Sequence, residues 1–156
     1  MASKFRNAGQ TCVCADRFLL HESIEENFLS KFVDKVKQLN VGSGMNKEVT
    51  MGPLISTKGA NIVHSKVKEA VDEGGECLIG GSLMPGLGAN FYEPTLIRNV
   101  NRASKLWKAE NFGPVAAIST FHTEEEVVET ANDTTSGLAA YFCSQNLERV
   151  FRVSRR

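Results

Sequence analysis

Five short apolar segments recur along the chain, each bounded by polar residues, glycine or proline. This pattern is typical of buried strands, which are short and end where turn-forming residues begin. The segments are long enough for strands but too short to cross a membrane. They cover residues 18–20, 77–79, 91–97, 115–121 and 138–142.

Between these segments, apolar residues recur every three or four positions, which predicts helices with one buried face. Two of the predicted starts carry a capping-box pattern, because Glu follows three residues after Ser23 and after Thr123. Gly74 and Gly75 end the helix predicted from Thr57. The four helices are predicted to begin near Ser23, Thr57, Thr123 and Asn146.

Strands and helices therefore alternate, which predicts an α/β fold with a largely parallel sheet and helices on both faces. We expect residues 1–156 to form a single domain, since no repeat or linker interrupts the pattern. The last helical pattern is not followed by a strand, so we expect the sheet to be incomplete at its C-terminal end. An uncovered sheet edge promotes association, and we predict a homo-oligomer through that edge.

Composition narrows the possible partners. Eighteen basic and eighteen acidic side chains give no net charge, and 42% of residues are hydrophobic. Neither nucleic acid nor an anionic membrane is expected as a partner, because no basic patch attracts them. The N-terminus lacks the apolar core of a secretory signal, so the cytoplasm or the mitochondrial matrix is the predicted location. The four cysteines and three histidines lack the paired spacing of metal sites, and no metal is predicted.

The residues with the strongest chemical signal surround Cys12. A Gly-Gln-Thr turn precedes this thiol, and Arg6 and Arg17 flank it. Positive charge beside a cysteine favours the thiolate, which is the nucleophilic form. The alternative is a small buried thiol without a chemical role, which is the commoner state of a cysteine.

The segment Phe-Arg-Asn-Ala-Gly-Gln-Thr-Cys-Val-Cys at residues 5–14 resembles the active-site cysteine segment of the aldehyde dehydrogenases. Within that family it is most similar to the succinate-semialdehyde dehydrogenase group. A second segment, Lys-Ala-Glu-Asn-Phe-Gly-Pro-Val at residues 108–115, is similar to the family's Glu-x-Phe-Gly-Pro segment. A third resemblance follows at residues 131–140, so the likeness extends over the chain.

The resemblance implies a role for five residues. Cys12 would add to the aldehyde carbon, the hemithioacetal would pass hydride to NAD or NADP, and water would hydrolyse the thioester. Glu110 and Phe112 would contact the nicotinamide ribose and ring. Arg6 would pair with the carboxylate of an acidic aldehyde such as succinate semialdehyde, the alternative being an ordinary surface arginine. Cys14 would capture an oxidised Cys12 as a disulfide, the alternative being a filler residue without redox function.

The same resemblance implies that the chain corresponds to a catalytic-domain segment without the dinucleotide-binding and oligomerisation parts. The Glu-Leu-Gly-Gly motif of the general base and the oxyanion-hole asparagine are not found in the sequence. We therefore expect the isolated chain to be nearly inactive, with doubtful NAD or NADP binding of its own. Two alternatives stay open: a truncated family member that acts as a binding or interaction module, and a residual thiol esterase that uses Cys12.

Overall fold

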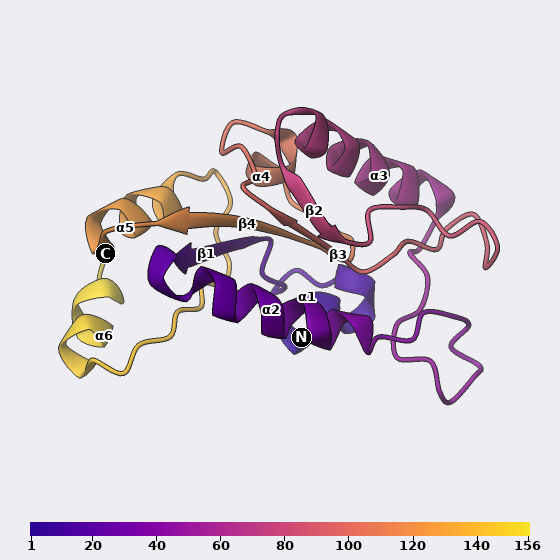
Figure 1. The fold of residues 1–156 in the computed structure, drawn as a ribbon, viewed down its shortest axis with the longest axis horizontal. Coiled ribbons are helices and arrows are strands. Elements are labelled where there is room, and N and C mark those ends of the chain that lie inside the picture. The colour runs from indigo at the N-terminus through magenta and orange to yellow at the C-terminus, as the bar shows by residue number, and fades with distance from the viewer.

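Four strands form one sheet at the centre of the protein, and helices lie on both sides of it (Figure 1). The computed structural model describes all 156 residues. Its strands are β1 (Arg17–His21), β2 (Glu76–Ile79), β3 (Thr95–Arg98) and β4 (Val115–Phe121). Its helices are α1 (Ala2–Phe5), η1 (Arg6–Gly9), η2 (Glu22–Ile24), α2 (Glu25–Lys37), α3 (Thr57–Asp72), α4 (Lys105–Lys108), α5 (Glu124–Asn132) and α6 (Leu147–Val153), of which η1 and η2 are 3-10 helices.

The sheet is mixed but largely parallel, in the order β1-β4-β3-β2. β4 pairs in parallel with β1 and with β3, and Arg17 of β1 aligns with Ala117 of β4. β2 runs antiparallel to β3 and forms one edge, while β1 forms the other. The predicted α/β class and the largely parallel sheet are confirmed. The antiparallel direction of β2 was not predicted, because a four-residue strand carries no local signal of its direction.

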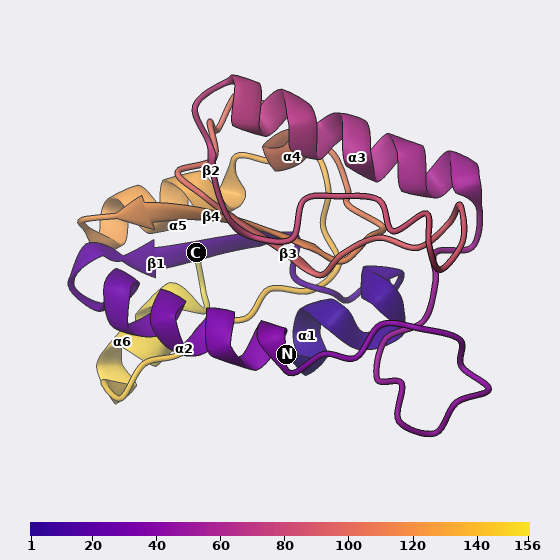
Figure 2. The ribbon, with the colours of Figure 1, turned by 45° about the vertical axis from the view of Figure 1, so that its right-hand side comes forward.

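The core lies between the sheet and helices on each side. Figure 2 shows α3 and α4 on one face of the sheet and α1 and α2 on the other. The first four residues of β4 are completely buried, as expected for a central parallel strand. The predicted helices α2 and α3 are confirmed, and each turns one apolar face inward. Their buried residues are Leu29, Phe32, Val36, Ala60, Val63, Val67 and Ala70.

The start of α2 differs from the prediction. Ser23 does not cap this helix; it lies in the short helix η2, and its backbone N–H donates to His21 Nδ1 (3.2 Å). α2 then begins at Glu25 without a side-chain cap. The imidazole of His21, at the end of β1, thus accepts the hydrogen bond from the Ser23 N–H that Glu26 was expected to accept in a capping box. At α5 the predicted Thr123 cap is confirmed, since its side chain accepts from the N–H of Glu126 (3.1 Å), but the Glu126 carboxylate accepts from the N–H of His122 (2.9 Å) and not from that of Thr123.

The strand predicted at residues 138–142 is absent. Leu138 is 70% exposed and Tyr141 is 62% exposed, in an irregular segment between α5 and α6. Residues 135–145 make no backbone-to-backbone hydrogen bonds. The apolar run suits a strand, but a strand also requires a partner for its backbone groups, and no neighbouring segment supplies one.

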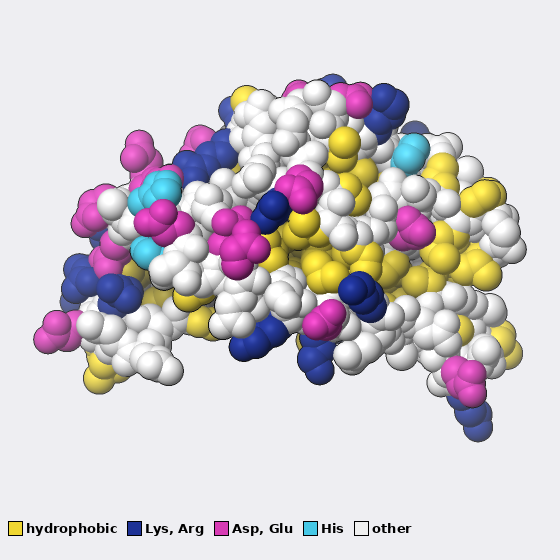
Figure 3. Space-filling model, in the orientation of Figure 1, with side chains coloured by type: hydrophobic (Ala, Val, Ile, Leu, Met, Phe, Trp, Pro, Cys, Tyr) yellow, Lys and Arg dark blue, Asp and Glu magenta, His cyan; other side chains and the backbone are white.

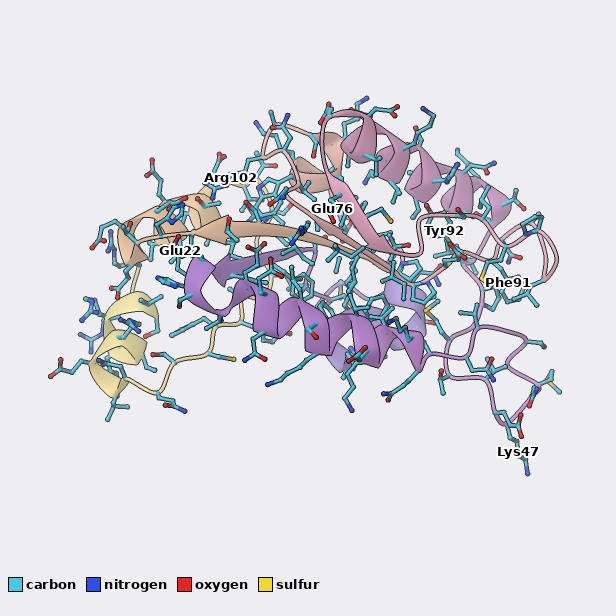
Figure 4. The ribbon with its side chains drawn as sticks, in the orientation of Figure 1. Glu22, Lys47, Glu76, Phe91, Tyr92 and Arg102 are labelled. Atoms are coloured by element: carbon cyan, nitrogen blue, oxygen red, sulfur yellow. The ribbon has the colours of Figure 1, made fainter.

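Charged side chains gather at the carboxyl ends of β1 and β4. Arg102 donates to the carboxylate of Glu126 (2.9 Å), and His122 Nδ1 lies 2.9 Å from a carboxylate oxygen of Glu22. The hydrogen bond to Glu22 raises the pKa of His122. Figure 4 labels Glu22 and Arg102 beside α5, and Figure 3 shows charged and histidine side chains grouped over this end of the molecule. This end of the sheet is therefore a polar surface.

α6 is joined to α5 mainly by charge. Both Arg149 and Arg152 donate to the carboxylate of Glu124 at the start of α5, at 3.1 Å and 2.6 Å. The predicted cap of α6 is confirmed, because the Asn146 side chain accepts from the N–H of Arg149 (2.9 Å). Hydrogen bonds from Arg152 and Arg149 lower the pKa of Glu124 to about 2.

The attachment of α6 to α5 should therefore be lost in acid. The folded pKa of Glu124 is below its ordinary value, so the stabilisation is complete above about pH 4.5 and disappears as pH falls towards about 2. We expect the backbone amide of Arg152, followed by NMR, to shift across that window. Glu124→Gln should abolish the transition, and Glu129→Gln on the same helix should leave it unchanged. A transition that persists in Glu124→Gln would contradict this assignment.

Candidate active site

Cys12 lies in a tight turn between η1 and β1. The turn follows three consecutive residues with left-handed backbone angles, Asn7 (φ 53°), Ala8 (φ 54°) and Gly9 (φ 75°). Residues other than glycine seldom adopt this conformation, and it is maintained only where surrounding contacts impose it. Cys12 and Val13 then occupy the centre of a turn closed by the N–H of Cys14 donating to the carbonyl of Thr11 (2.8 Å). The Cys12 thiol is exposed to solvent.

Two amide side chains hold this turn. Asn7 Nδ2 donates to the carbonyl of Gln10, and Gln10 Nε2 donates to the carbonyl of Asn7, both at 3.0 Å. Gln10 also reaches the loop after Val49, where its Oε1 accepts from the N–H of Ile55 (2.8 Å) and its Nε2 donates to the carbonyl of Pro53 (3.3 Å). The segment before Cys12 is thus fixed both internally and to a second loop.

The cysteine turn meets the segment of residues 110–113, although about a hundred residues separate them in sequence. Gly9 packs so closely on the carbonyl of Gly113 that a Cβ at Gly9 would overlap it. Asp16 Oδ2 accepts from the N–H of Asn111 (3.1 Å). Each segment immediately precedes one of the neighbouring parallel strands β1 and β4, so both reach the same end of the sheet.

Side chains alternate in exposure along residues 110–112. Asn111 is 2% exposed, and its Nδ2 donates to the carbonyl of Leu106 (3.0 Å). Glu110 and Phe112 on either side are exposed, Phe112 by 45%. The Glu110 carboxylate makes no hydrogen bond or ion pair within the chain. A free carboxylate and an accessible phenyl ring fit the ribose hydroxyls and the ring of a nicotinamide nucleotide, respectively.

The two arginines that flank Cys12 differ in their surroundings. Arg6 is exposed and its guanidinium has no hydrogen-bond partner in the chain. Arg17 lies 5.6 Å from the ring centroid of Trp107 and donates to the carbonyls of Thr130, Ala131 and Asp133 at the end of α5. Cations at a helix C-terminus are stabilising, so Arg17 has a structural role. Its expected contribution to the charge beside Cys12 is not supported, because its guanidinium is directed to α5.

All four cysteines are free thiols. Cys14 is half-buried, two residues after Cys12, and the hydroxyl of Tyr141 donates to the carbonyl of Val13 between them (3.2 Å). Cys77 lies far away on β2, where burial raises the pKa of its thiol. No three His, Cys, Asp or Glu side chains lie close enough together to hold a metal ion.

The whole chain, residues 1–156, matches the model of the family described as Aldehyde dehydrogenase family. The chain belongs to the aldehyde dehydrogenase family. It is 44% identical to the mitochondrial succinate-semialdehyde dehydrogenase of Oryza sativa subsp. japonica, over 99% of this chain and 29% of that protein. It is also 44% identical to succinate-semialdehyde dehydrogenase [NADP(+)] 1 of Schizosaccharomyces pombe, over 98% of this chain and 31% of that protein.

Solved aldehyde dehydrogenase structures agree with this fold. The succinate-semialdehyde dehydrogenase of Burkholderia pseudomallei superposes with a TM-score of 0.96 at 42% identity, over 99% of this chain and 32% of that one. The chain thus spans about 30% of the length of the aldehyde dehydrogenases that it matches. None of its helices has the length and apolar character needed to cross a bilayer, and the longest, α3, has 16 residues.

The sequence analysis missed the polar residues that join the two candidate active-site segments. Lys4, Asp16 and Asn111 are hydrogen-bonded to one another, yet they are far apart in sequence or separated by the cysteine turn. The only local sign of this role was the polar side chain of Asn111 between Glu110 and Phe112, the two residues that the resemblance identified. The anchoring role of Gln10 was also missed, since its partners lie more than 40 residues away.

Proposed function

We propose that the chain is part of an NAD(P)-dependent aldehyde dehydrogenase that oxidises succinate semialdehyde or a similar acidic aldehyde, with Cys12 as the nucleophile. The observation that carries this proposal is the contact of Gly9 and Asp16, on either side of the exposed Cys12 turn, with residues 110–113, in a chain of this family. The succinate-semialdehyde dehydrogenases that it resembles support the substrate class, and the NADP(+) in the name of one supports the cofactor class.

In this proposal the Cys12 thiolate adds to the aldehyde carbon and forms a tetrahedral hemithioacetal. Loss of hydride from that carbon gives a thioester at Cys12, which water hydrolyses to the carboxylic acid. A nicotinamide nucleotide, when bound, supplies the hydride acceptor. Glu110 would accept hydrogen bonds from its ribose hydroxyls, and Phe112 would support its ring. The tight turn around Cys12 fixes where the thiol attacks, which is the kind of orientation that accelerates such reactions.

We propose further that residues 1–156 are one catalytic-domain segment and that the dinucleotide-binding and oligomerisation parts of the enzyme are separate from it. The chain spans about 30% of its relatives, which supports this division. Cytoplasm or mitochondrial matrix remains the proposed location, in line with the mitochondrial enzyme of Oryza sativa. The chain alone is then expected to bind and react at Cys12 without sustained turnover.

Alkylation of Cys12 tests this function without requiring turnover. Iodoacetamide should modify Cys12 faster than Cys77 at neutral pH, because a catalytic nucleophile is exposed and reacts as its thiolate. The rate is read from the Cys12 peptide by mass spectrometry, in the Cys14→Ala variant so that one thiol of the turn is followed. Cys77, whose pKa is raised by burial, provides the internal reference.

Succinate semialdehyde should also slow this alkylation, since it would occupy the thiol as a hemithioacetal. A Cys12 that reacts no faster than Cys77, together with no protection by the aldehyde, would refute the nucleophile role. The residual thiol-esterase alternative is examined in the same samples with an activated ester. Repeated hydrolysis of the ester that depends on Cys12, without aldehyde protection, would favour that alternative.

Arg6 is the proposed contact for the substrate carboxylate. Its guanidinium is exposed, is free of partners, and lies six residues before Cys12, so it is available for a bidentate pair. Arg6→Leu should weaken protection of Cys12 by succinate semialdehyde about tenfold while leaving protection by butanal unchanged. Arg155→Leu, which removes an equal charge at the other end of the chain, is the control. Equal losses for the two aldehydes would show that Arg6 does not recognise the carboxylate.

Cys14 is the proposed redox partner of Cys12. A peroxide would oxidise the Cys12 thiolate to a sulfenic acid, and the Cys14 thiol would displace water from it to form a disulfide. The two free thiols lie two residues apart in one turn, which supports the proposal. Mass spectrometry of protein treated with mild peroxide should detect this link, and Cys12 oxidised without it would refute the switch.

We also propose that the chain forms a homo-oligomer through the free edge of β1. This strand has a partner on one side only, and unpaired strand edges promote association. The exposed apolar residues of the 138–142 segment support the alternative function, an interaction module without dehydrogenase activity. Light scattering after size-exclusion chromatography should show a dimer or larger species. A monomer at all concentrations would argue against both the homo-oligomer and the interaction module.

A further inference from the structure

Lys4 is a fully buried cation near the base of the cysteine turn. Its side chain is 0% exposed, and its Nζ donates to Asp16 Oδ1 (3.1 Å) and to the carbonyl of Asn111 (3.3 Å). Burying a charge is costly unless a counter-charge and hydrogen bonds compensate it. Asp16 and Asn111 supply that compensation, so Lys4 remains buried only while both of these hydrogen bonds are kept.

Asp16, which lies after the cysteine turn, is hydrogen-bonded to both Lys4 and Asn111. Its Oδ1 accepts from Lys4, and its Oδ2 accepts from the N–H of Asn111 (3.1 Å). The backbone N–H of Ala15 donates to the carbonyl of Ser3 (2.7 Å), which closes the base of the loop next to the ion pair. One carboxylate thus joins both ends of the cysteine loop to the segment that carries Glu110 and Phe112.

A second lysine holds Asn111 from the α3 side. Lys66 Nζ donates to the carbonyl of Glu110 (2.6 Å) and to the side-chain oxygen of Asn111 (3.3 Å). Burial lowers the pKa of Lys66, although the carboxylates of Asp16 and Glu110 oppose this shift. With Leu106 accepting from its Nδ2, Asn111 has both its backbone and its side chain fixed. The exposed neighbours of Asn111 are therefore held in place by contacts to Asn111.

We infer that Lys4 and Asp16 are positioning residues that fix the Cys12 turn relative to the Glu110–Phe112 segment. This inference rests on the proposed function, because it assigns the purpose of the arrangement to the alignment of nucleophile and cofactor. A buried ion pair is weak support for stability, since well-packed apolar residues often replace one without loss. What apolar residues cannot reproduce is the directed contact of one carboxylate with both Lys4 and the N–H of Asn111.

The test separates positioning from stability with a paired apolar replacement. Asp16→Asn leaves a buried lysine without its counter-charge and offers one acceptor for two donors, so it should loosen both segments and lower stability. The double variant Lys4→Met with Asp16→Leu removes both charges and should unfold at a urea concentration close to that of the unmodified chain. Glu76→Gln, which breaks a remote ion pair with Arg98, is the control.

Two readouts are followed in each folded variant. Hydrogen exchange at the amide of Asn111 should accelerate about tenfold in the double variant, because its acceptor is lost. The rate of Cys12 alkylation should fall towards that of Cys77. An unchanged exchange rate of the Asn111 amide and an unchanged rate of Cys12 alkylation in the folded double variant would overturn the inference. If Cys12 of the unmodified chain already reacts no faster than Cys77, the proposed function fails, while hydrogen exchange still decides whether the two segments are coupled.

Discussion

Gly9→Ala is expected to lower the free energy of unfolding by about 2–5 kcal/mol, the sum of left-handed strain and overpacking. Gly9 has φ 75°, where an L-residue with a Cβ is strained. The added methyl would also overlap the carbonyl of Gly113, which is backbone and cannot rotate away. The two candidate active-site segments would have to separate, so the candidate site would be affected together with the fold.

Urea unfolding followed by the fluorescence of Trp107, the single tryptophan, measures this change. Gly44→Ala is the matched control, because nothing lies within 4 Å of its Cβ position. It should leave stability within about 0.5 kcal/mol of the original value. Hydrogen exchange should also increase at residues 110–113 in Gly9→Ala. Equal stability of the two variants would show that the contact between Gly9 and Gly113 is looser than described.

Ile118→Ala is expected to cost about 2–5 kcal/mol, the usual range for removing a large buried aliphatic side chain. Ile118 is 0% exposed at the centre of β4, and it aligns with Phe18 of β1. The lost side chain leaves a cavity that its close-packed neighbours fill only in part. Because β4 follows directly after Gly113 and Pro114, the change should also be felt at Phe112.

The control for this substitution is Ile55→Ala, at a position that is 89% exposed. The same atoms are removed there without a cavity, so the effect should stay within about 0.5 kcal/mol. Both variants are compared by the urea concentration at the midpoint of unfolding. A loss below about 1 kcal/mol for Ile118→Ala would mean that the core around β4 collapses onto the gap more completely than most cores do.

Local sequence patterns were sufficient for most elements of the fold. The run from Val115 to Phe121 is a strand at the predicted residues, since it is apolar, β-branched in part, and preceded by Gly-Pro. The predicted α3 lies between a serine cap and two glycines. In both cases the signal that decides the structure lies within the element itself.

Features that depend on distant partners were harder to predict. Residues 138–142 have the composition of a strand but no neighbour to pair with, so they remain irregular and exposed. Ser23 lost its predicted capping role to His21, because the chain leaves β1 through a 3-10 turn. A local sequence pattern does not specify which backbone groups will be hydrogen-bonded to other parts of the chain.

The candidate site divides in the same way. The resemblance identified Cys12, Arg6, Glu110 and Phe112, and their chemical roles remain predictions. The sequence does not reveal that Arg17 is engaged by Trp107 and the end of α5, or that Lys4 and Asp16 join the two segments. These contacts span from 12 to more than 100 residues and follow from the folding of the whole sheet.

The parallel pairing of β1 with β4 sets the distance between the Cys12 turn and the Glu110–Phe112 segment. Cys12 lies five residues before β1, and Phe112 lies three residues before β4, so their separation depends on the alignment of Arg17 with Ala117. A slip of one residue between these strands would displace one segment along the other by about 3.3 Å and turn its side chains to the opposite face. The distance between Cys12 and Phe112 is thus set by a hydrogen-bond ladder that contains neither residue.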